Sequence, residues 1–141
     1  EVLAWAERLS AQPELLPGNE REEELDAALA RQAVRFGVGR HVGRLSELFT
    51  PSGLIWVQDG KDLSEVKTVI GTGGVVVNSR RPEQILSGAA GTENAPFELR
   101  PKEPQYLMDR LYIMAPMGLL AEEYPEEAFA LLTNVLESKS L

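Results

Sequence analysis

Apolar residues recur at helical spacing in the first third of the chain. Over residues 1–16 they predict a short amphipathic helix, which Pro17 and Gly18 then punctuate. Asn19 is a good N-cap for a second helix, and the acidic residues after it complement the dipole of the first turns. Because the apolar positions continue at the same spacing, we predict that this helix extends to about Leu48.

Three glycines, Gly37, Gly39 and Gly43, lie inside this second predicted helix. A glycine weakens a helix by about 1 kcal/mol relative to alanine. We therefore interpret the three positions as places where another backbone or a ligand comes close to the chain.

Shorter apolar runs between turn signals predict strands in the middle of the chain. Residues 50–53 are interpreted as a turn, and residues 54–57 as a short strand that Asp59 and Gly60 close. The stretch 66–78 is interpreted as a buried, β-branched strand that runs directly into a glycine-rich loop. A short helix is expected just after this loop, with a proline suited to its first position.

The last third of the chain changes from loop to helix. Residues 88–105 are rich in glycine, proline and polar groups and are interpreted mostly as loop. The apolar segment 109–123 is expected to be helical, although Pro116 interrupts it where a small helix-forming residue would be expected. Pro125 begins a final helix, and one face of it is expected to carry Ala128, Leu131, Leu132, Val135 and Leu136. Helices with a few strands between them predict one layered α/β unit that covers residues 1–141.

Composition and charge narrow the classes of partner. Of the 141 residues, 43% are hydrophobic and 26% are charged, which is typical of a globular domain. The formal net charge of −8 disfavours binding to nucleic acid and to anionic membrane surfaces. No apolar run approaches the roughly 20 residues that span a bilayer. The absence of cysteine excludes disulfides and thiolate metal sites and fits a reducing cytoplasm. Since the chain starts at a glutamate, we expect it to be a piece of a longer protein.

The glycine-rich loop is the segment most suited to chemistry. Without side chains, Gly73 and Gly74 let a flat or charged ligand lie against the backbone, and their amides can donate hydrogen bonds to it. The carboxyl end of a parallel strand is where α/β proteins usually bind ligands. A tight turn that needs positive φ explains the same residues equally simply. The loop is neither a P-loop nor a complete dinucleotide-binding fingerprint.

Several segments occur in the order typical of one known family. They are Gln12–Pro17, Arg40–Gly43, Thr50–Gly53, Gly60–Leu63, Val69–Gly74, and Asp109 through Met117–Ala121. On these segments, which cover nearly the whole chain, the sequence resembles the MutL/GlmL accessory proteins of adenosylcobalamin-dependent glutamate mutase. These proteins are unrelated to the mismatch-repair protein of similar name.

The resemblance implies a fold, a cofactor and a partner. That family is similar to the actin, Hsp70 and sugar-kinase superfamily, so we expect a ribonuclease-H-like α/β lobe, the C-terminal part of an actin-like ATPase. It implies that Gly71, Thr72, Gly73 and Gly74 hold the adenosine of ATP or ADP, and Asn78 either touches the ligand or caps the next turn. Magnesium and the phosphates are expected to be held mainly by parts outside this chain, so the chain alone is not expected to be catalytic. Subunits of a cobalamin-dependent mutase are the expected partners.

Other residues give weaker signals. His41 is the only histidine, and without a second ligand beside it a structural role is favoured over metal binding. Arg80 and Arg81 follow the glycine loop and either reach a phosphate or the base of a nucleotide or are solvated at the start of a helix. No catalytic residues and no metal ligands are assigned. Two other functions stay open, which are one lobe of a small-molecule kinase and a non-catalytic interaction domain.

Overall fold

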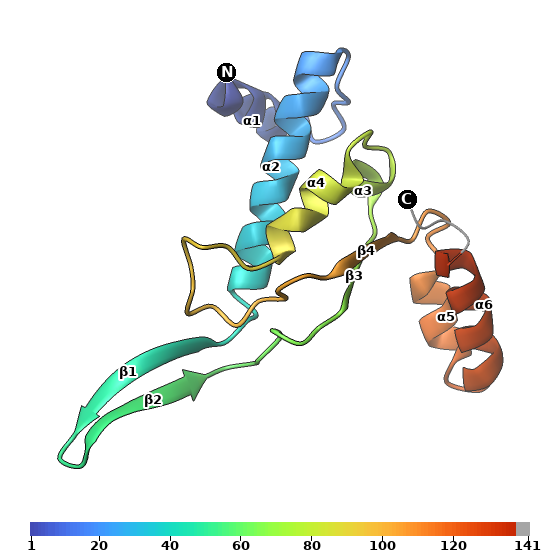
Figure 1. Ribbon diagram of the computed structural model, residues 1–141. Coiled ribbons are helices and arrows are strands. Elements are labelled where there is room, and N and C mark those ends of the chain that lie inside the picture. The colour runs from blue at the N-terminus through green and yellow to red at the C-terminus, as the bar shows by residue number, and fades with distance from the viewer. Residues whose placement is uncertain (138–141) are drawn as a thin grey trace.

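The computed structural model describes residues 1–137 as a helical body with two short parallel strands, from which two arms project (Figure 1). In chain order the elements are α1 (Val2–Ala11), α2 (Glu20–Gly39), β1 (Arg44–Thr50), β2 (Gly53–Asp59), β3 (Thr68–Gly71), α3 (Gly74–Val77), α4 (Pro82–Leu86), the 3₁₀ turn η1 (Ser87–Ala89), β4 (Gln105–Met108), α5 (Met114–Leu120) and α6 (Pro125–Glu137). The predicted mixed α/β class is confirmed. None of the helices within the described residues is both long enough and apolar enough to cross a membrane.

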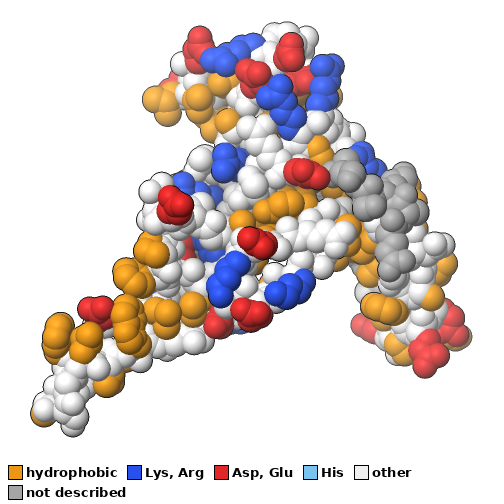
Figure 2. Space-filling view, viewed as in Figure 1, with side chains coloured by type: hydrophobic (Ala, Val, Ile, Leu, Met, Phe, Trp, Pro, Cys, Tyr) orange, Lys and Arg blue, Asp and Glu red, His pale blue; other side chains and the backbone are white. Residues whose placement is uncertain are grey.

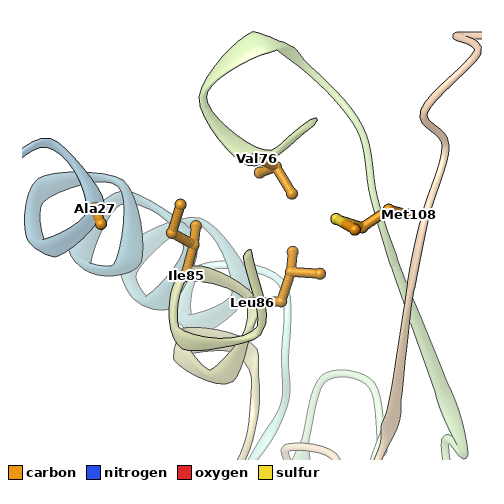
Figure 3. Close-up of a cluster of buried hydrophobic side chains, with 5 residues drawn as sticks. All are labelled: Ala27, Val76, Ile85, Leu86 and Met108. Atoms are coloured by element: carbon orange, nitrogen blue, oxygen red, sulfur yellow. The ribbon is translucent and has the colours of Figure 1, made fainter. Parts of the chain in front are cut away.

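The body is built around a parallel pair of strands joined by helices. β3 pairs with β4 from Thr68 opposite Gln105 to Gly71 opposite Met108, and the connection between them contains α3, α4 and η1. A crossover of this kind places helices on one face of the strands. The core cluster consists of Ala27 from α2, Val76, Ile85 and Leu86 from the crossover, and Met108 from β4 (Figure 3).

The helix predicted from Asn19 starts as expected but ends earlier. The Asn19 side chain accepts a hydrogen bond from the backbone N–H of Glu22 at 3.0 Å, which confirms the N-cap. The prediction that the helix extends to Leu48 is wrong, because α2 ends at Gly39 and residues 44–50 form strand β1. Leucines at helical spacing in this segment pair with β2 instead, so tertiary pairing overrides the local pattern.

The three glycines have different neighbours. A Cβ on Gly43 would lie 2.6 Å from the carbonyl oxygen of Asp59 and from the carbonyl carbon of Gly60, so another backbone does approach there. A Cβ on Gly39 would lie 2.6 Å from the guanidinium of Arg100, while one on Gly37 would meet open space. The predicted approach of another backbone is therefore confirmed for Gly43, whereas Gly39 meets a side chain and no backbone comes close to Gly37.

The first arm is the antiparallel hairpin β1–β2 (Figure 1). The predicted turn at 50–53 and the strand after it are confirmed. Apolar side chains lie on both faces of the hairpin, since alternate residues of a strand point to opposite sides. Phe49, Leu54 and Trp56 share one face and Leu48 and Ile55 the other, and all five are exposed. Figure 2 shows hydrophobic side chains along this arm. At the base, the ring centroids of Trp56 and Phe97 lie 5.6 Å apart.

The strand before the glycine loop is shorter and less buried than expected. β3 has four residues, and only Val69 and Gly71 face the covered side, while Thr68 and Ile70 are exposed. The valines after the loop form the single helical turn α3. The expectation of a buried strand is therefore wrong for Thr68 and Ile70, which are exposed.

The second arm is the helix pair α5–α6 (Figure 1). Pro116 is the third residue of α5, where an N–H would have no intrahelical partner, so it belongs to the first turn and does not interrupt the helix. α5 is capped by the buried Asp109, whose carboxylate accepts from the N–H groups of Ile113 and Met114. α6 begins at Pro125 as predicted. On its predicted apolar face, Ala128 and Leu136 are buried, whereas Leu131 is exposed.

A buried arginine joins three segments of the body. The Arg100 guanidinium is 5% exposed, donates to the carbonyl oxygens of Arg35 at 2.8 Å and Gly88 at 3.0 Å, and pairs with Glu98 at 2.5 Å. It thereby fastens the end of α2 and η1 to the loop before β4. On the exposed side, Arg44 also pairs with Glu98 at 2.7 Å.

We expect Arg100→Leu to lower the free energy of unfolding by about 3 kcal/mol, because it leaves Glu98 half-paired and removes the side-chain donor to the carbonyl oxygens of Arg35 and Gly88, the second of which is bonded at a buried position. The matched control is Arg44→Leu, which removes the exposed partner of the same carboxylate and is expected to cost at most about 1 kcal/mol. Chemical denaturation followed by circular dichroism measures both. Equal losses in the two variants would contradict the structural role given to Arg100.

The ion pair between Arg100 and Glu98 predicts that the stability of the fold depends on pH. The hydrogen bond from Arg100 holds the pKa of the Glu98 carboxyl below its ordinary value, against the opposing effect of desolvation. A lowered pKa in the folded state stabilises the fold at neutral pH, and that contribution is lost as the pH falls below the ordinary range of a glutamate and through the folded-state pKa. Between neutral pH and about pH 3, wild type should therefore lose more stability than Glu98→Gln. Parallel stability curves for the two proteins would contradict this.

Candidate functional site

The glycine loop makes a sharp change of direction between β3 and α3. Gly73 has φ +95° and ψ 154°, a backbone conformation that side chains other than glycine rarely adopt. Its carbonyl oxygen accepts from the N–H groups of Val76 and Val77 and so starts the helical turn. The need for a glycine at this position is thus explained by the turn alone, whatever else the loop binds.

Gly71 and Thr72 lie on the inner and outer sides of this turn. A Cβ on Gly71 would lie 2.6 Å from Leu86 Cδ2 and 2.9 Å from Val76 Cγ1, so Gly71 lets α3 and α4 pack closely on the strand. Thr72 is exposed. Neither residue lines the hollow next to the loop.

Gly74 and Asn78 do line that hollow, which we call the glycine-loop groove. The Asn78 side-chain amide donates to the carbonyl oxygen of Gly74 at 3.0 Å, so both are held on one side of α3. The groove has a volume of about 680 Å³. Its walls come from α1 and the α1–α2 linker, from α2, and from the crossover: Leu9, Pro13, Leu15, Leu16, Pro17, Glu23, Asp26, Ala27, Gly74, Val75, Asn78, Ser79, Arg80 and Ile85.

The groove combines apolar walls with acceptors. Leucine, proline, valine, isoleucine and alanine residues form most of the lining, and the carboxylates of Glu23 and Asp26 form its acidic part. Arg80 is the only basic residue of this lining, and its Nε lies 3.2 Å from Glu23. This chemistry suits a flat, weakly polar body that carries hydrogen-bond donors, and it disfavours a polyphosphate deep in the groove.

The two arginines after the loop are engaged with the acidic start of α2. Arg80 pairs with Glu23, and Arg81 lies 3.8 Å from Glu24. Beneath these two pairs is a separate hollow of about 40 Å³, too small for a nucleotide. In this structure both arginines therefore brace α2 against the loop, and both remain exposed at the surface.

The residues on the linker and α2 sides of the groove were not identified from the sequence. Leu15, Leu16, Glu23 and Asp26 were not predicted as site residues, although they face the predicted loop across the groove. One signal was available, because a pair of leucines between Pro13 and Pro17 is unusual in an exposed linker. Nothing in the sequence showed that this linker lies beside residues about 60 positions later.

The remaining candidates lie elsewhere. His41 is exposed after the end of α2, with its Nε2 at 3.5 Å from the Nζ of Lys61. Within residues 1–137, no three His, Cys, Asp or Glu side chains lie together in a way that could hold a metal ion.

Comparison with known proteins identifies the family. The family model described as "MutL protein" matches residues 1–136. A curated relative, "Protein MutL" of Clostridium tetanomorphum, is 41% identical over 122 residues, which make up 86% of this chain and 26% of the relative. The chain therefore spans about a quarter of the length of that relative. No solved structure matches this chain. A match over nearly all residues, together with this identity, shows that the chain belongs to the MutL protein family.

Proposed function

We propose that this chain supplies the adenosine-binding side of an ATP-dependent accessory protein that serves a cobalamin-dependent glutamate mutase or a related aminomutase. Membership of the MutL family supports the accessory role. The observation that carries the nucleotide role is the groove in which Gly74 and Asn78 face the linker and α2.

The groove fits adenosine in size and chemistry. Its volume lies within the range of small-molecule sites, from about 300 to 1,000 Å³. At Gly74 a Cβ would have its nearest neighbour 3.9 Å away, so the backbone is open to a ligand on this side. Glu23 and Asp26 can accept hydrogen bonds from ribose hydroxyls or from the amino group of the base. We expect the phosphates and magnesium to extend out of this acidic groove toward parts of the longer protein.

The parallel β3–β4 unit supports a ribonuclease-H-like lobe. Ligands of α/β folds bind at the carboxyl ends of parallel strands, and the glycine loop directly follows the carboxyl end of β3. We infer that the nucleotide state sets the closure of this lobe against another, and that closure opens the mutase to exchange a damaged cofactor. Hydrolysis would require residues outside this chain.

Titration of the chain with ADP and magnesium should shift backbone amide NMR signals at Gly73, Gly74 and Asn78, and at Asp26 across the groove. Gly74→Leu should weaken binding roughly tenfold or more, because its side chain projects into the groove where no atom now blocks it. Gly118→Leu is the matched control, since this exposed helical glycine in α5 also has open space around it and does not line the groove. Unchanged spectra at millimolar ADP, or equal effects of the two substitutions, would count against a nucleotide site.

The accessory role is tested on the longer protein. Added with ATP to mutase that has been inactivated in turnover, it should restore activity, and the Gly74→Leu variant should restore much less. Mutase that remains inactive with and without ATP would contradict the role. Phosphorylation of a small acceptor by the same preparation would favour a small-molecule kinase instead.

A further inference from the structure

The wall of the groove opposite the glycine loop is formed by an exposed apolar linker. Leu15, Leu16 and Pro17 lie between α1 and α2 and line the groove across from Gly74 and Val75. Leu16 is 80% exposed, although it borders a hollow of about 680 Å³. Apolar surface of this kind gains free energy when a ligand covers it.

This linker is held in place from one side. In α1, Trp5 is the buried residue, and α1 packs against α2. Glu22 of α2 accepts from Arg8 at 2.8 Å and from the N–H of Gly18 at 2.8 Å, which fixes both ends of the segment that carries the leucines. The wall is thus positioned by α2, the same helix that contributes Glu23 and Asp26 to the groove.

We propose that Leu16 is a specificity residue that packs on the heteroaromatic ring of the bound nucleotide, opposite the bare backbone of Gly74. This inference rests on the proposed function and adds to it the wall that recognises the base. A flat ring has two apolar faces, and here one would meet an aliphatic side chain while the other would meet a peptide plane without a side chain. The carboxylates remain available to the donors on the ring edge and the ribose.

The chain contains a matched control for this role. Leu3 in α1 is 79% exposed, close to the value for Leu16, but it does not line the groove. Leu3→Gln and Leu16→Gln therefore make the same chemical change at equally exposed sites. Because neither side chain is buried, both variants are expected to keep the fold, and Leu16→Ala provides a second variant without a new polar group.

The experiment is an NMR titration of wild type and the three variants with ADP, adenosine and ribose 5-phosphate. We expect Leu16→Gln and Leu16→Ala to weaken the binding of ADP and of adenosine roughly fivefold to tenfold. Leu3→Gln should leave the affinity for both ligands unchanged. Ribose 5-phosphate, which lacks the base, should bind equally to wild type and to the Leu16 variants.

Any of the following three outcomes would overturn the proposal. If ADP shifts the amide signals of the glycine loop in wild type but binds equally well to the Leu16 variants, Leu16 has no role in binding. The proposed nucleotide site would then still stand. If Leu3→Gln weakens binding as much as Leu16→Gln, the effect is not that of a groove wall. If ADP and adenosine shift no amide of wild type, the nucleotide site and the role of Leu16 fall together.

Discussion

The packing of α4 between α2 and the parallel strands is the contact on which the body of this molecule depends. Ile85 is completely buried and Leu86 nearly so, and together with Ala27, Val76 and Met108 they join the long helix, the crossover and the strands (Figure 3). Leu86 can come this close to β3 because Gly71 has no side chain. Ile85 also lines the glycine-loop groove, so the core and the candidate site share a residue.

α2 connects the groove to the opposite end of the body. Its first turns carry Glu23 and Asp26 into the groove, and its last turn is held by the hydrogen bond from Arg100 to the carbonyl of Arg35. The hairpin begins a few residues later and is anchored where Gly43 lies against Gly60. A rigid helix of 20 residues therefore relates the position of the groove to that of the exposed hairpin.

The two walls of the groove are held with different strength. α1 and its linker are fixed by one buried tryptophan and by hydrogen bonds at exposed positions, each of which contributes little in water. By contrast, the glycine loop is fixed by backbone geometry at Gly73 and by packing at Gly71. The glycine-loop wall is thus held more firmly than the linker wall.

Local chemistry determined the elements whose signals lie within one or two turns. The cap at Asn19, the helix starts at Pro82 and Pro125 and the turn before β2 all follow from residues near in sequence, since caps and turns satisfy their own backbone groups. The glycine loop was also located from the sequence, and the structure places Gly74 and Asn78 on a groove. Their binding of adenosine remains a prediction.

Only the tertiary structure decided the features that depend on distant partners. The spacing of Leu45, Leu48 and Phe49 fits a helix as well as a strand, and pairing with residues 53–59 selects the strand. Pro116 was misjudged because its effect depends on where the helix begins, which Asp109 sets from outside the helix. The opposite wall of the groove comes from a linker whose position is fixed by side-chain contacts with α2. Periodicity describes how a segment can fold, but contacts between segments choose among the possibilities.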